Sequence, residues 1–225
     1  MERIANSQFS KLIEQVKAFL ENESSGHDFY HSERVFKTAL FIQSREGGDE
    51  YVIGASALLH DICRPWEKKT GKSHFGNEAL EIIREVLHKS GAPKEKIPLV
   101  LNVIALHDVY DWTEKTEDKS IELQVVQDAD NLDAIGAMGI ARTFMFGGHH
   151  GQPMYLPEED LVFVEDFVDG SPKGKSVVAH FYEKLLKLKD NMNTQTGIKL
   201  AQKRHEIVLS FLNQFFKEWE SNLEE

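Results

Sequence analysis

The sequence predicts an all-α fold, a single-domain helical bundle, on three observations. Apolar residues recur every three to four positions through most of the 225-residue chain, which is the period of an amphipathic helix. Capping residues, glycines and prolines interrupt this pattern at helix-length intervals. No stretch alternates convincingly as a strand, and the nearest candidate, residues 161–168, has no hairpin partner.

The first two helices are predicted near residues 7–22 and directly after Asp28. Asp28 is a favourable N-cap, since its carboxylate can accept from a free backbone N–H of the first turn. His31 then lies in the first turn of the second helix, and Gly47 begins the glycine pair that ends it.

The third helix is predicted to begin at Asp49 and to run into the dipeptide His60-Asp61, where Pro65 stops it. Residues 64–73 read as a loop rich in cations. Beyond it the pattern predicts a helix closed by Gly91, a helix from Pro93 to His107, a polar linker over residues 111–120, one long helix or two over 121–146, a loop over 147–153, and two helices near 175–189 and 194–219.

Composition restricts the class of protein. No apolar run approaches the 18 or so residues that a membrane helix requires. A single cysteine, Cys63, excludes an intramolecular disulfide and fits a cytoplasmic protein. The net charge of −11 argues against non-specific nucleic-acid binding but leaves room for a small anionic substrate in a locally positive cleft. The oligomeric state stays open, with a homodimer as one option.

Adjacent histidine and aspartate residues are in excess. With 10 His and 13 Asp in 225 residues, chance predicts about 0.6 His-Asp pairs, and the chain has three, which begin at His27, His60 and His107. The pair His60-Asp61 ends an apolar run, where burying both side chains is costly unless something pairs with them. A divalent metal would pair with both, because imidazole nitrogen and carboxylate oxygen are its ordinary ligands.

Three segments in order, around His31, around His60-Asp61 and over residues 127–134, resemble the HD-domain superfamily of metal-dependent phosphohydrolases. The resemblance covers about residues 26–142 and is strongest to small bacterial single-domain HD hydrolases, some of which cleave nucleoside triphosphates. It implies an all-α domain over residues 1–225, with the helices of 175–219 packed on the metal-binding core. It also implies one divalent ion, with Mn²⁺ or Mg²⁺ favoured and Fe²⁺, Zn²⁺ or Ni²⁺ not distinguished. The implied ligands are His31, His60, Asp61 and Asp130.

Two extra histidines, His74 and His107, fall between the His-Asp pair and the last aspartate, as they do in HD proteins with two metals. Those families carry two adjacent histidines at the later position, whereas here Asp108 follows His107. We therefore expect one metal, with Asp61 and either His74 or His107 in the catalytic machinery, the histidine contacting phosphate or donating a proton. A helix-end His107 that only interacts with the helix dipole remains the alternative.

Cations near these segments are candidate substrate contacts. Arg34 follows His31 by three residues and Arg64 follows Asp61 by three, so each shares a helical face with a proposed ligand. A guanidinium can grip two phosphate oxygens, although a solvated surface arginine is the competing interpretation. Lys72 represents the lysines of residues 68–72, one of which would neutralise substrate charge.

Three aspartates, Asp128, Asp130 and Asp133, share one predicted helix. At about 100° per residue, Asp128 and Asp130 fall on opposite edges of the apolar face, so one ion cannot easily take both. The resemblance selects Asp130 as the ligand. Asp133 points further inward on the Asp130 side and is expected to support the metal or to contact substrate, whereas Asp128 would be a flanking carboxylate, paired or solvated.

These residues predict an enzyme that hydrolyses a small phosphate ester or anhydride, with a bound divalent ion activating the water. The resemblance implies a nucleotide as substrate, and the leading candidate is a nucleoside or deoxynucleoside triphosphate, cleaved to monophosphate and pyrophosphate. The alternative is a metal-bound nucleotide-sensing module with little turnover, and a structural helical adaptor without metal is a third possibility.

Overall fold

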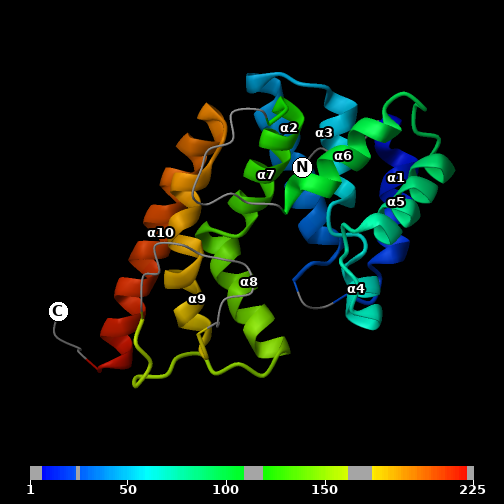
Figure 1. The fold of residues 1–225 in the computed structure, drawn as a ribbon. Helices are drawn as coiled ribbons and strands as arrows, with labels where there is room; N and C mark the ends of the chain where they lie inside the picture. Colours follow the sequence, from blue (N-terminus) through cyan, green and yellow to red (C-terminus); the bar gives the residue numbers. More distant parts are fainter. Residues whose placement is uncertain (1–6, 24–25, 109–118, 162–173, 222–225) are drawn as a thin grey trace. The chain divides into compact units, whose positions relative to one another are not determined.

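The computed structural model describes residues 7–23, 26–108, 119–161 and 174–221, and throughout these ranges the regular elements are helices, which confirms the all-α prediction (Figure 1). In chain order the elements are η1 (Ser7–Phe9), α1 (Ser10–Phe19), α2 (Phe29–Glu46), α3 (Glu50–Leu59), α4 (Arg64–Thr70), α5 (Asn77–Ser90), α6 (Ile97–His107), α7 (Ile121–Asp133), α8 (Gly136–His149), α9 (Val177–Glu183), η2 (Leu185–Asn191) and α10 (Gln195–Trp219).

The chain forms two compact units, residues 1–130 and 131–225, and the boundary falls inside α7. One domain over residues 1–225 therefore stays a prediction. The expected linker over residues 111–120 lies largely outside the described residues, and so does most of the strand candidate at 161–168.

The first unit is built around α3, which packs against α1, α2 and α6, while α5 packs against α1 and α6. Gly54 permits the close approach of α3 to its neighbours, because a Cβ atom there would lie only 2.5 Å from Phe9 Cζ and 2.9 Å from Phe36 Cε2. Both aromatic rings are fully buried, at 0% and 1% exposed. Residues 55–59 are also buried, so the C-terminal end of α3, where His60 and Asp61 follow, is anchored in the core.

Two predicted caps are confirmed. The Asp28 carboxylate accepts from the backbone N–H of His31 at 2.9 Å and begins α2, so His31 lies in the first turn as expected. The Asp49 carboxylate accepts from the N–H of Val52 at 3.0 Å and begins α3. Both bonds satisfy N–H groups that the first turn of a helix leaves free.

Two predicted loops are wrong. Pro65 does not stop α3, which ends at Leu59, but sits in the first turn of α4, where its missing N–H costs nothing. The glycines that begin the predicted loop at 147–153 are helical, since α8 continues to His149. A Cβ atom on Gly147 would lie 2.1 Å from Val177 Cγ2, so packing against α9 explains that glycine.

In the second unit, α8 and α9 pack on each other, and α10 packs on α8 and on η2. Three aromatic rings join the helices, with Phe144 centred 5.9 Å from Phe181 and 5.8 Å from Phe211. The predicted segment of one helix or two over residues 121–146 proves to be two, because the chain turns before Gly136, whose φ of +76° favours glycine.

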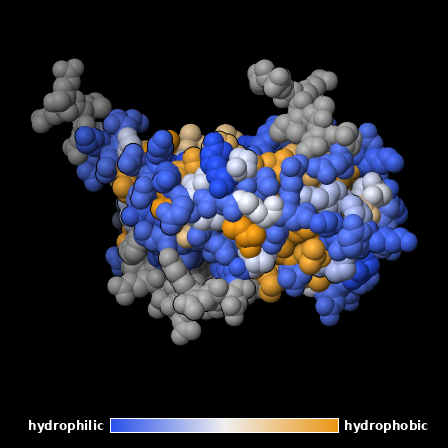
Figure 2. Space-filling view, turned by 90° about the horizontal axis from the view of Figure 1, so that it is seen from above, coloured by the Kyte–Doolittle hydropathy of each residue, from blue (hydrophilic) through white to orange (hydrophobic). Residues whose placement is uncertain are grey.

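Charged and polar side chains cover most of the face shown in Figure 2, with smaller hydrophobic areas between them. None of the helices in the described ranges has both the length and the apolar character needed to cross a bilayer.

Candidate active site

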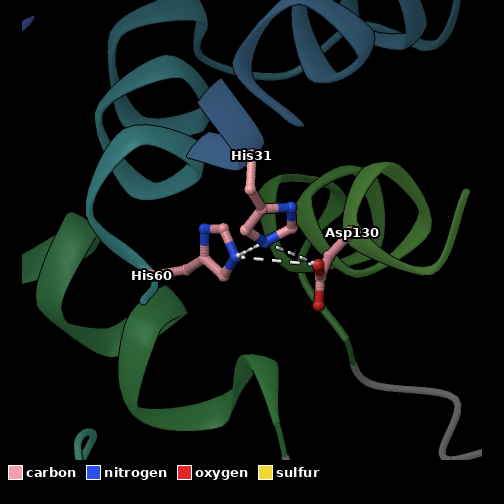
Figure 3. A group of neighbouring side chains, drawn as sticks. All are labelled: His31, His60 and Asp130. Carbon is pink, nitrogen blue, oxygen red and sulfur yellow. Dashed lines mark hydrogen bonds and ion pairs between the residues drawn. The ribbon is translucent and has the colours of Figure 1, made fainter. Parts of the chain in front are cut away.

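Three side chains that are distant in the sequence meet in the first unit. His31 comes from the first turn of α2, His60 caps the C-terminus of α3, and Asp130 comes from α7. Their ligand atoms point toward one another (Figure 3), with 3.1 Å between His31 Nε2 and His60 Nε2. Asp130 Oδ1 lies 3.4 Å from His31 Nε2 and 3.6 Å from His60 Nε2. This group of two imidazoles and one carboxylate could hold a metal ion.

The backbone fixes the orientation of His60. Its Nδ1 lies 2.9 Å from the carbonyl oxygen of Ala57, and a carbonyl only accepts, so Nδ1 carries the proton. When His60 is neutral, the lone pair of its Nε2 faces His31 and Asp130. A histidine that donates its other N–H to a carbonyl is the arrangement usual for metal-ligating histidines.

Asp61 joins this group to a second one. Its Oδ2 lies 3.6 Å from the Nε2 atoms of both His31 and His60. Its Oδ1 accepts from Arg64 Nε at 2.9 Å and lies 3.6 Å from His74 Nε2. The two oxygens of one buried carboxylate therefore face two separate clusters of imidazoles.

The second group consists of Asp61, His74 and His107, which could also hold a metal. His107 donates Nδ1–H to the carbonyl of Ile104 at 2.7 Å. His74 Nδ1 lies 3.1 Å from the Glu67 carboxylate, so the N–H is on Nδ1. His74 Nε2 is buried without a hydrogen-bond partner.

His74 Nε2 also lies 3.6 Å from both Asp61 Oδ1 and Asp108 Oδ2. With its Nδ1–H given to Glu67, a neutral His74 directs a lone pair at two carboxylate oxygens. Such converging acceptors need a cation between them, either a proton or a metal ion. The structure thus brings together the two histidines that the sequence left without a definite role.

The close packing of histidines and carboxylates shifts the pKa values of several residues of the site. Burial alone would lower the pKa of His60, but the charges of Asp61 and Asp130 outweigh it and raise the pKa to about 9. Burial would raise the pKa of Asp130, but hydrogen bonding and charge from His60 hold that pKa well below its usual range. Burial and the nearby charge of His60 lower the pKa of His107. Without metal, a proton on His60 supplies the positive charge that the carboxylates require.

Arg64 lies at the site, and three carboxylates contact its guanidinium. Its guanidinium contacts Asp61 at 2.9 Å, Asp108 at 3.3 Å and Glu67 at 3.4 Å. Burial would lower the pKa of Arg64, but these carboxylates raise it above its ordinary value. The bond to Asp61 Oδ1 orients that carboxylate, and the phosphate contact expected of Arg64 stays a prediction.

The other predicted substrate residues differ in their surroundings. Arg34 is part-buried on α2, one turn after His31. Lys72 is exposed and pairs with Glu78, at 2.6 Å from Oε2. In the second unit, Asp133 is buried and accepts from Arg142 at 2.9 Å. Substrate contacts by these residues also stay predictions.

Asp128 is fully buried, at 0% exposed, so the solvated alternative proposed for it is wrong. The helical wheel assumed one apolar face, whereas residues 125–129 of α7 are all buried. When a helix is buried on most sides, its side chains are buried on both edges of the apolar face as well. The angular position of a side chain around the helix then predicts which way it points but not whether it is exposed.

Sequence reasoning missed three residues of the site. His27 Nε2 lies 3.8 Å from Asp61 Oδ2, Glu67 orients His74, and Asp108 faces His74 and Arg64. The excess of His-Asp pairs contained a signal for His27 and Asp108, since each belongs to one of the three pairs. Glu67 gave no signal, because it fell in a segment predicted to be a loop.

Comparison with known proteins decides the family. The model of the HD domain matches residues 28–135, the segment that contains both groups. The Bacillus subtilis protein YpgQ is 36% identical over 204 residues, covering 90% of this chain and 89% of YpgQ. This chain belongs to the HD-domain superfamily. The predicted resemblance is confirmed, and the protein is a metal-dependent phosphohydrolase of the HD type.

Solved structures agree with this HD-domain assignment. An HD-superfamily hydrolase from Bacillus thuringiensis is 38% identical, with a TM-score of 0.71, covering 97% of this chain and 98% of that one. The structure of Bacillus subtilis YpgQ in complex with ADP is 33% identical, with a TM-score of 0.67, covering 92% of this chain and 97% of that one.

Proposed function

We propose that this HD-domain hydrolase cleaves a nucleoside or deoxynucleoside triphosphate to the monophosphate and pyrophosphate. The observation that carries the proposal is the meeting of His31, His60, Asp61 and Asp130, which is suited to a divalent ion. A nucleotide is favoured because the related YpgQ structure contains ADP.

The first group has the donors that a hydrolytic metal needs. The two imidazoles and one carboxylate of this group, with Asp61 as a fourth donor, suit several first-row ions as well as Mg²⁺, and Mn²⁺ or Mg²⁺ is our leading candidate. When bound, such an ion would lower the pKa of water and polarise a phosphoryl oxygen. Arg64 holds Asp61 in the orientation in which Oδ2 faces both histidines.

Metal binding should release a proton, because the ion must displace the proton on His60. The pKa of His60 in the metal-free protein is raised to about 9, above its ordinary value of 6.5, so the residue is protonated at pH 7. Apparent metal affinity should rise about tenfold per pH unit up to that pKa. Titration calorimetry in two buffers of different ionisation enthalpy measures the proton released, and a release of zero would contradict this expectation.

The same shift predicts how the metal-free protein responds to pH. A raised folded-state pKa stabilises the fold fully below the unfolded value of 6.5, and this contribution is lost as the pH rises through about 9. Denaturant unfolding of the metal-free protein at pH 6 and pH 9 would test the direction, with the metal-loaded protein as control.

The number of ions has two candidate answers. We expect one ion in the first group, with His74 or His107 acting on the phosphate. The converging acceptors of Asp61, His74 and Asp108 favour a second ion as the alternative. The metal content of wild-type protein and of a His74→Ala variant separates the two, because only a two-ion site loses one ion and keeps the other.

Arg34→Ala should leave metal content intact and lower kcat/KM by about 10- to 1000-fold, or roughly one to a few kcal/mol of transition-state binding. Arg34→Lys should restore little of it, because an ammonium cannot make two parallel bonds to a phosphate. Steady-state kinetics measures both variants. If Arg34→Ala had wild-type kinetics, Arg34 would not contact the substrate and the phosphate-binding prediction would be wrong.

The proposal is tested by a nucleotide panel assayed with several divalent metals, with products identified by chromatography. Monophosphate and pyrophosphate are the expected products. Tight nucleotide binding without any product would favour the sensing module instead. We also propose that the protein is cytoplasmic. Lys72 and Asp133 are proposed to contribute to substrate binding.

A further inference from the structure

The last turn of α6 is held from outside the helix by a buried amide. Gln127 of α7 donates Nε2–H to the carbonyl oxygen of His107 at 3.0 Å and to that of Leu106 at 3.4 Å. The final carbonyls of a helix have no partner within it, so a donor from another element satisfies them here. Gln127 is 0% exposed and His107 is 1% exposed, which places these bonds in the interior of the protein.

The partners of the Gln127 amide settle its orientation. Its Oε1 lies 3.0 Å from the ammonium nitrogen of Lys119, which only donates, whereas its Nε2 faces carbonyl oxygens, which only accept. A flipped amide would face donor with donor at one end and acceptor with acceptor at the other. Gln124, about one turn earlier on α7, donates its amide to the Lys119 carbonyl at 2.8 Å. Lys119 is therefore bonded to α7 through both its backbone and its side chain.

His107 is fixed at both its ring and its backbone. Its Nδ1–H is donated to the Ile104 carbonyl at 2.7 Å within α6, which orients the ring, while Gln127 holds its carbonyl from α7. The ring meets that of His60 edge to face, with centroids 5.3 Å apart, and it belongs to the second group. The position of the end of α6 relative to α7 therefore determines where this imidazole lies.

The helix that supplies Gln127 also supplies Asp130, three residues later and thus about one turn away. Asp130 Oδ1 faces the two imidazole nitrogens of the first group at 3.4 and 3.6 Å. Near the start of α7, Glu122 accepts from the backbone N–H of Asp49 at 3.0 Å, which joins α7 to the beginning of α3. Of these two side chains that join α7 to other helices through backbone groups, Gln127 is the nearer to Asp130. A change at Gln127 would therefore alter the distance between Asp130 and His107.

We propose that Gln127 is a positioning residue, which sets the distance between His107 of the second group and Asp130 of the first. Its amide acts through the backbone of α6, not by binding substrate. A side chain that caps a helix end stabilises that helix, but here the capped residue and the capping helix each carry one part of the active site. The assignment goes beyond the proposed function, since it holds whichever phosphate bond the enzyme cleaves.

The test compares Gln127→Met with Gln124→Met. Methionine keeps the length of glutamine but cannot donate a hydrogen bond, so the carbonyls at the end of α6 lose their donor. Gln124→Met is the matched control, because it removes an amide of the same helix whose bond goes to Lys119 and not to α6. Long-range ¹H–¹⁵N spectra of the metal-free proteins, labelled at histidine, report each imidazole ring, and a His107→Gln variant identifies the signals of His107.

Gln127→Met should shift the ring signals of His107, and Gln124→Met should leave them at their wild-type positions. The affinity for Mn²⁺ alone, measured by electron paramagnetic resonance, should fall by about 10-fold in Gln127→Met only, as is typical when a residue that supports a metal site is lost. If the methionine variant does not fold, Gln127→Asn replaces it, because its neutral amide is one methylene too short to reach both partners.

Unchanged His107 signals in a folded Gln127 variant would overturn the assignment. Equal shifts in Gln127→Met and Gln124→Met would also overturn it, because the cause would then be a general disturbance of α7. Shifted His107 signals with a wild-type affinity for Mn²⁺ would overturn the link to Asp130. Neither measurement uses a nucleotide, so a failure of the proposed function would leave these outcomes unaffected.

Discussion

The His60→Ala variant is expected to lose both its bound metal and its hydrolytic activity. His60 is fully buried and faces His31, Asp61 and Asp130 within 3.6 Å. Removing a residue that hydrogen-bonds to a metal ligand typically lowers metal affinity or activity by about 10- to 100-fold. Removing the ligand itself should therefore have a larger effect. We expect less than about one ion in ten chains and a fall in kcat/KM of more than about 100-fold.

Elemental analysis by plasma mass spectrometry measures the ion, and a nucleotide assay measures the turnover. Chelator treatment of the wild type should reproduce the loss, and added metal should reverse it. His88→Ala, on the exposed side of α5, controls for general effects of removing a histidine. Unchanged metal stoichiometry in His60→Ala would show that the ion binds elsewhere.

The second large effect is expected at Asp130. Asp130→Asn keeps the size of the side chain but removes the charge that faces both imidazoles at 3.4 and 3.6 Å. The neutral amide is a poor ligand for a hard divalent ion, so we expect metal affinity and activity to fall together. The pKa of His60 should also move down toward its usual range, because the Asp130 charge helps to raise it.

Asp128→Asn is the matched comparison on the same helix. Asp128 is buried but belongs to neither candidate metal group. We expect it to keep most metal and activity, with any cost appearing as a lower free energy of unfolding. Metal titrations and denaturant unfolding of both variants separate the two effects. If Asp128→Asn lost the metal and Asp130→Asn kept it, the register assigned to α7 would be wrong.

Much of the fold was predictable from local sequence patterns. Asp28 and Asp49 were recognised as caps because an N-cap bond forms within four residues. Pro65 was misread, because proline disfavours a helix interior but suits a first turn, and the sequence does not say which position it occupies. Gly147 was misread for a similar reason, since a glycine that packs against α9 looks like a helix breaker.

The sequence by itself determined which residue types could bind a metal and which helices carry them. His31, His60 and Asp130 were identified through a resemblance, and the structure brings them together. Only the tertiary structure decided that Asp61 stands between two groups, that Glu67 orients His74 and that His27 lies beside Asp61. Local patterns follow from the period of one helix, whereas these contacts depend on how separate helices cross, which is set by side chains buried between them.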